Sequence, residues 1–242
     1  MRVSQGYQKA LFEECTNVFS RIDDARKYRE LDVDNTVLVD TPEVCIAEQA
    51  LHTMPTPDGV SLAFSVPDVS LISLDGLLAG CAQYRERTKR TREGMERMFP
   101  DMQVNDAFSF RANHHEDVAT QTVPAITFVL GPEGAGGLVV RSVKPTVVPK
   151  TPIVIRMSSH ARLQQTDLAL VADWFPDRVY PSTIAALATD AVNVWAQSRL
   201  TGTKAATLDH CTIHRPLRRY EDYRNLVQIA QIVQQNPVLP LE

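Results

Sequence analysis

The spacing of hydrophobic residues changes from a helical period to an alternating one and back along the chain. Apolar side chains recur every three or four positions in residues 7–29, 182–200 and 220–235. This period places them on one face of a helix. Pro181 precedes the second of these segments and Gly202 follows it, as is typical of helix boundaries. The sequence therefore predicts helices near both ends, with a further helix at 74–98 and another at 163–174.

The middle of the chain alternates or runs apolar in short stretches, which is typical of strands. Residues 60–66 alternate after a turn at 55–59, and residues 107–157 show no helical period. A glycine-rich segment, 131–137, separates two apolar runs and predicts a long hairpin. Prolines at 145, 149 and 152 favour edge strands or bends, because each removes one backbone donor. Residues 36–39 and 208–213 are also expected as strands, whereas 42–53 fits either a helix or a strand.

This order of elements predicts an α+β fold. We expect a proline-interrupted, mainly antiparallel sheet at about 104–157, flanked by N-terminal and C-terminal helices, because strands and helices do not alternate regularly. The length of 242 residues and a hydrophobic content of 44% suit a single folded domain over residues 1–242. Within this domain, weak boundaries between parts of the fold are expected near residues 100–105 and near residue 158.

Charge and composition limit the classes of function. The net charge of −4 is not the basic balance of a dedicated nucleic-acid binder. Four dispersed cysteines form no zinc or disulfide pattern. The chain begins without an apolar leader, and no apolar run approaches the length of a membrane span. We therefore expect a protein of the cytoplasm, or of a particle assembled there, with no membrane partner.

One short string has the composition of an active site. Asp32-Val33-Asp34-Asn35-Thr36 is followed by Val37-Leu38. It resembles the first motif of the haloacid dehalogenase-like phosphatases. The resemblance implies that Asp32 attacks phosphorus and binds Mg²⁺, that Asp34 exchanges the proton of the leaving group, and that Ser158 and Lys204 complete the site.

The surroundings of this string also support a structural interpretation. In that family a buried strand precedes the first aspartate, but here residues 27–30 are polar and mostly charged. A final acidic pair after an apolar strand has no clear counterpart. Asp32 and Asp34 can equally cap or turn the chain between a helix and a strand.

Other polar clusters point less clearly to a site. His114 and His115 with Glu116 and Asp117 are metal-ligand types, but adjacent strand residues face opposite sides. A site combining either histidine with His210 is an alternative. The glycine segment lacks the G-K-[ST] ending of a phosphate-binding loop. We predict no cofactor.

Two arginine clusters could contact an anionic partner. One lies at residues 85–97 and includes Arg87 and Arg90; the other lies at residues 215–224 and includes Arg218 and Arg219. Solvated faces with ion pairs between neighbouring turns are the alternative interpretation.

The sequence suggests three hypotheses of function. The first, which we favour, is a protein without enzymatic activity. It is a structural or assembly protein, for example of a virus or phage particle, that self-associates or binds other proteins of an assembly. Its expected contacts are the hairpin tip, the arginines and the apolar tail, namely Gly134, Gly136, Gly137, Arg87, Arg90, Arg218, Arg219, Leu239 and Leu241. The second is a Mg²⁺-dependent phosphohydrolase using Asp32 and Asp34. The third, which composition does not favour, is a nucleic-acid-associated module that uses the arginine clusters.

Overall fold

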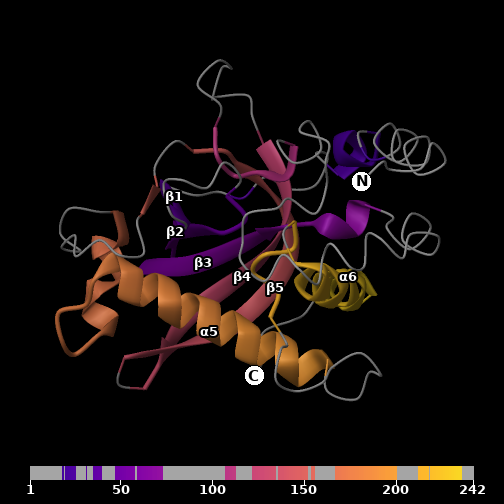
Figure 1. Ribbon diagram of the computed structural model, residues 1–242. Helices are drawn as coiled ribbons and strands as arrows, with labels where there is room; N and C mark the ends of the chain where they lie inside the picture. The colour runs from indigo at the N-terminus through magenta and orange to yellow at the C-terminus, as the bar shows by residue number, and fades with distance from the viewer. Residues whose placement is uncertain are drawn as a thin grey trace, which may run out of the picture.

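The protein has an α+β fold, as the sequence predicts. The computed structural model describes residues 18, 20–25, 31, 35–39, 47–57, 59–72, 107–112, 122–134, 136–151, 154–155, 167–200, 212–217 and 219–235. Within these, six strands form one sheet, and helices pack against it (Figure 1). The predicted 74–98 helix lies outside the described residues.

The sheet is larger than the sequence suggested, because it also takes in strands from the first 70 residues. Its order is β5-β4-β3-β2-β1-β6, and every pairing is antiparallel except the one between β1 and β6. The strands are β1 (Asn35–Val39), β2 (Ala50–Thr56), β3 (Gly59–Pro67), β4 (Thr122–Glu133), β5 (Gly137–Pro149) and β6 (Val154–Ile155). The ambiguous segment at 42–53 therefore contributes a strand in its last four residues. The predicted long hairpin is confirmed as β4 and β5.

Helices cover one face of the sheet. They are η1 (Val69–Leu71), η5 (Asp167–Trp174), α5 (Pro181–Leu200) and α6 (Tyr220–Gln235), of which η1 and η5 are 3₁₀ helices. In Figure 1, α5 crosses in front of the sheet, and it packs on β5 and β3, while α6 packs on β5 and η1. None of the helices within the described ranges is long and apolar enough to cross a bilayer.

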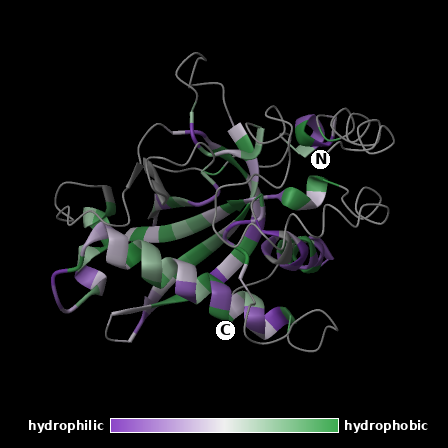
Figure 2. Cartoon of the chain, viewed as in Figure 1, coloured by the Kyte–Doolittle hydropathy of each residue, from purple (hydrophilic) through white to green (hydrophobic). Residues whose placement is uncertain are grey.

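The larger core lies between the sheet and these helices. Strand residues such as Phe64 and Phe128 meet Ile184 of α5 and Leu226 of α6 in one buried cluster. The ring of Phe128 packs edge-on against Trp195, with 5.5 Å between ring centroids. In Figure 2, the strands are mainly green, whereas most purple residues lie on helices and loops. Periodicity thus predicted the inward faces of α5 and α6 correctly.

Some local expectations were wrong. Ala107 and Phe108 are helical, and within the described residues 107–112 only Arg111 forms a β-bridge, an isolated one to Thr151, which lies outside the strands. Phe108 and Phe110 are nevertheless both buried, and they belong to two different core clusters. Ser109 between them is buried as well, so burial does not alternate here as it would in a half-exposed strand. Likewise, the described end of the expected 208–213 strand, Thr212 and Ile213, lies in no strand.

The prolines of β5 lie where the sheet needs no donor. β5 is an edge strand, and the carbonyl oxygen of Val147 accepts from the N–H of Leu31, 2.9 Å away, so Val147 points away from β4. N–H and C=O groups of one residue share a direction, and alternate residues repeat it. The backbone groups of Pro145 and Pro149 therefore also face away from β4. Because of this, the absence of an N–H at either proline removes no hydrogen bond between β4 and β5.

A line of buried polar side chains crosses the other face of the sheet. His52 Nε2 lies 2.9 Å from Ser65 Oγ, which lies 2.7 Å from Thr127 Oγ1, which in turn lies 2.6 Å from Thr146 Oγ1. All four residues are buried, one on each of β2 to β5. We call these four residues the polar ladder. Because shifting a strand would leave buried groups unpaired, the ladder specifies the register of four strands.

Replacing Ser65 should show what the polar ladder contributes. Ser65→Ala removes the hydroxyl shared by His52 and Thr127, and we expect it to lower the free energy of unfolding by about 1–3 kcal/mol. Urea denaturation measures this change. Ser61→Ala, at a half-buried position of the same strand, is the control and should cost under about 0.5 kcal/mol. Equal losses in the two variants would contradict the role of the ladder.

His52 should also make the fold sensitive to acid. Burial lowers the pKa of His52 to about 3 from its ordinary 6.5, so the folded protein keeps this ring neutral. Between these values only the unfolded chain binds the proton, and stability is lost as pH falls below about 6.5. From pH 6.5 to 4.5 this loss amounts to roughly 2.5 kcal/mol. His52→Gln should lose less stability than the wild type by about that amount, as measured by denaturation at the two pH values.

Candidate nucleic-acid interface

Most residues predicted as sites lie outside the described part of the chain. These are Asp32, Asp34, Ser158 and Lys204 of the phosphatase-like set, the arginines Arg87, Arg90 and Arg218, the tail residues Leu239 and Leu241, and the histidines His114, His115 and His210. The phosphatase-like and metal interpretations of these residues stay predictions.

The glycine tip of the β4–β5 hairpin contacts its own chain. Gly134 and Gly136 have φ values of +57° and +93°, which residues with side chains rarely adopt. A Cβ at Gly136 would lie 3.3 Å from Pro176, so the tip packs closely against the segment before α5. Gly137, the third tip residue predicted as a partner contact, begins β5. Contact of the tip with a partner stays a prediction.

The second arginine cluster forms a tight turn that leads into α6. The N–H of Arg219 donates to the carbonyl of Arg215, 2.9 Å away, and the N–H of Tyr223 donates to the carbonyl of Arg219 at 3.0 Å. We call residues 212–217 together with Arg219 the arginine loop. Both hydrogen bonds have the i to i−4 spacing of an α-helix, so they connect the loop to the N-terminus of α6. The position of the loop is therefore fixed relative to α6.

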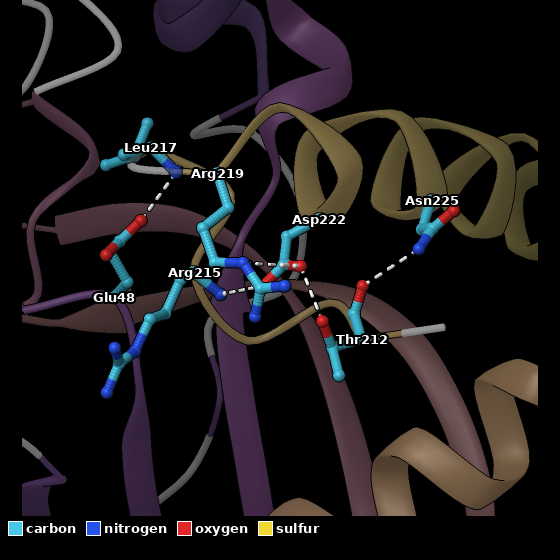
Figure 3. A network of polar contacts seen from close by, with 7 residues as sticks. All are labelled: Glu48, Thr212, Arg215, Leu217, Arg219, Asp222 and Asn225. Atoms are coloured by element: carbon cyan, nitrogen blue, oxygen red, sulfur yellow. Dashed lines mark hydrogen bonds and ion pairs between the residues drawn. The ribbon is translucent and has the colours of Figure 1, made fainter. Parts of the chain in front are cut away.

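Asp222, in the first turn of α6, contacts several residues of the arginine loop (Figure 3). Its carboxylate is buried and accepts from the hydroxyl of Thr212 at 2.6 Å and from the backbone N–H of Arg215 at 2.9 Å. The Nε of Arg219 lies 3.7 Å from the same carboxylate. Two hydrogen bonds to a buried charge are among the stronger contacts available to a loop.

Two further side chains fix the ends of the loop. Asn225 of α6 donates to the carbonyl of Thr212 at 3.0 Å. From the sheet side, the buried carboxylate of Glu48, just before β2, accepts from the N–H of Leu217 (Figure 3). The N–H groups of residues 215 and 217 are therefore bound by two separate carboxylates. The backbone of the loop is held between α6 and the sheet.

Arginine side chains are what this arrangement presents to solvent. Arg215 and Arg224 are exposed, and the side chain of Arg219 is 35% exposed. Planar guanidinium groups on a fixed backbone suit oxyanions such as phosphate, two oxygens of which can accept two parallel hydrogen bonds. Within the ranges that the structure describes, no three His, Cys, Asp or Glu side chains gather as a metal site would require. The arginine loop is accordingly a candidate site for an anion.

Sequence reasoning found these arginines but missed the carboxylates that position them. Glu48 gave no signal, because it is 169 residues from its partner Leu217 and belongs to no motif. Asp222 gave only a weak signal. It lies three positions after Arg219, and this helical spacing predicts an ion pair on the surface of the helix. Instead its carboxylate is buried and bonded to the loop backbone.

Comparison with known proteins relates the fold to ribonucleases. The sequence matches no protein-family model and no curated protein sequence. The structure is similar to an active-site mutant of the Dss1 exoribonuclease from Candida glabrata, with a TM-score of 0.54 and 12% sequence identity over 89% of this chain. The likeness spans only 42% of the Dss1 chain.

Two other structures align at lower scores. Yeast Ssd1, a pseudonuclease, gives a TM-score of 0.36 at 16% identity, over 77% of this chain and 21% of its own. Apo RNase R from Mycoplasma genitalium gives 0.38 at 14% identity, over 89% and 35%. TM-scores below 0.5 do not establish a common fold. The comparison with Dss1 therefore defines an α+β domain with the fold of part of an exoribonuclease.

The carboxylate of Asp222 should be essential to the stability of the arginine loop. Asp222→Ala leaves the Thr212 hydroxyl and the Arg215 N–H without their acceptor, and we expect a loss of about 3 kcal/mol in the free energy of unfolding. Asp190→Ala, at an exposed position of α5, is the matched control and should change stability by under about 0.5 kcal/mol. Chemical denaturation distinguishes the two, and similar values for both would contradict the role of Asp222.

Proposed function

We propose that this chain is an RNA-binding domain whose arginine loop contacts the phosphate backbone. The observation that carries the proposal is the arginine loop itself, whose backbone is fixed by the buried carboxylates of Glu48 and Asp222 while Arg215 faces solvent. The proposal concerns binding, and makes no statement about cleavage.

A fixed loop favours binding of a flexible anionic chain. Ordering a mobile arginine loop on binding would reduce affinity, and here the hydrogen bonds of Asp222, Asn225 and Glu48 supply that order beforehand. The net charge of −4 counted against nucleic acid when averaged over the chain. Affinity for a phosphate backbone depends on the local charge that reaches it, which the arginine loop and Arg224 provide.

The choice of RNA among anionic partners comes from the fold. The similar structure is named as an exoribonuclease, and this chain shares the fold of part of it. Because one fold can host different functions, this step is an analogy, and the arginine loop is the part argued from residues.

The other two hypotheses stay predictions. No described residue tests the phosphohydrolase set of Asp32, Asp34, Ser158 and Lys204, and none tests self-association through the hairpin tip or the apolar tail. Neither gains a specific supporting observation from the fold.

Removing two exposed arginines should weaken binding and reduce its dependence on salt. The double variant Arg215→Gln, Arg224→Gln spares Arg219 and its contact with Asp222. We expect it to bind a fluorescein-labelled 12-nucleotide oligouridylate on the order of tenfold more weakly at about 0.1 M salt. The slope of log affinity against log salt should fall by about 1.4, since each lost contact to a single strand removes about 0.7. Fluorescence polarisation measures both quantities.

A matched double variant controls for the change in net charge. Lys144→Gln with Arg178→Gln removes the same charge from exposed positions on β5 and on the segment before α5. It should leave affinity within about twofold of the wild type if binding is local rather than a general charge effect. Equal losses in the two variants, or no binding by the wild type, would overturn the proposal.

A further inference from the structure

We infer that the outer face of α6 continues the RNA interface and contacts ribose 2′-hydroxyl groups. This inference rests on the proposed function, because it extends the same interface from phosphate to sugar. Four positions along α6 define the surface, namely Arg224, Gln228, Gln231 and Gln235, which we call the glutamine stripe.

Helical geometry places these residues in one line. At about 100° per residue, Gln231 lies about 20° short of two full turns from Arg224, and Gln235 lies about 20° beyond three turns. Arg224, Gln231 and Gln235 are exposed, and Gln228 is half-buried. The opposite face is buried in the core through Leu226, Ile229, Ala230 and Val233. The orientation of the helix is therefore fixed with the glutamine stripe outward.

The composition of the stripe differs from that of an ordinary solvated face. Exposed helix faces commonly carry charges of both signs in pairs one turn apart. Beyond Arg224 the remaining eleven residues of α6 carry no charge, and four of them are glutamine. The one acidic side chain that the structure describes in α6, Asp222, is buried. The eleven residues after Arg224 therefore add no negative charge that would repel a polyanion from this part of the helix.

Amide side chains match the chemistry of ribose. The 2′-hydroxyl both donates and accepts hydrogen bonds, and a glutamine amide offers both an acceptor oxygen and a donor NH₂ group. The arginine loop leads directly into α6, so a strand whose phosphates contact Arg215 and Arg224 can pass along about 16 Å of helix from Arg224 to Gln235. Phosphate contacts position the strand, and the glutamines distinguish RNA from DNA.

The test compares RNA with DNA of the same base. Binding of labelled 12-mers of uridine and of deoxyuridine is measured for the full chain and for the double variant Gln231→Ala, Gln235→Ala. We expect the variant to bind the RNA about tenfold more weakly, as two lost hydrogen bonds imply, and the DNA within about twofold of the wild type. Alanine is a stronger helix former than glutamine, so the helix itself is not weakened.

Gln234→Ala is the matched control on the same helix. Gln234 is exposed but lies about 80° from Arg224 around the axis, to the side of the stripe. Its replacement should leave both affinities within about twofold. An equal loss on RNA and DNA in the double variant, or no loss on RNA, would overturn the role of the glutamines. If the wild type binds RNA and loses affinity through Arg215→Gln, Arg224→Gln, the proposed function still stands; if the wild type binds neither oligomer, both fail.

Discussion

The fold depends on bringing the first strands and the last helix together, and a buried carboxylate does this at one point. Glu48, just before β2, accepts a hydrogen bond from the backbone of Leu217, 169 residues further along the chain. A buried charge is costly unless donors surround it, so this contact forms only when sheet and C-terminal segment are both in place. It therefore couples the sheet to the arginine loop, and movement of the loop away from the sheet would break this hydrogen bond.

Hydrogen bonds between buried polar groups specify how the elements of this protein are arranged. The polar ladder from His52 to Thr146 fixes strand register, Asp68 caps η1 through Ser70, and the hydroxyl of Tyr223 donates to the carbonyl of Ile72 at 2.6 Å. Burial raises the pKa of Asp68, whereas its hydrogen bonds from Ser70 act in the opposite direction. Of these contacts, the Tyr223 hydrogen bond joins α6 to the residue that follows η1.

The parts of the fold that follow from local pattern could be predicted, and those that depend on distant contacts could not. The apolar stripe of α5, the extent of α6 and the hairpin of β4 and β5 are visible in spacing and turn residues alone. Residues 42–53 remained ambiguous, because the choice of strand for Ala50 onward comes from pairing with β3. Arg215 and Arg219 were recognised as a basic cluster, but Glu48 could not be, since only the folded chain brings it to Leu217.

An exposed arginine is common, and three on a surface would not distinguish this chain from many others. What distinguishes the arginine loop is that two buried carboxylates accept hydrogen bonds from its backbone, in addition to the contacts of Asp222 with the hydroxyl of Thr212 and with Arg219. Asp222 accepts from the N–H of Arg215, and Glu48 from that of Leu217. The buried carboxylates thus fix the backbone of the loop, while the side chain of Arg215 is exposed. The order of this loop therefore comes from hydrogen bonds to its backbone, and it does not depend on holding the side chain of Arg215 in place.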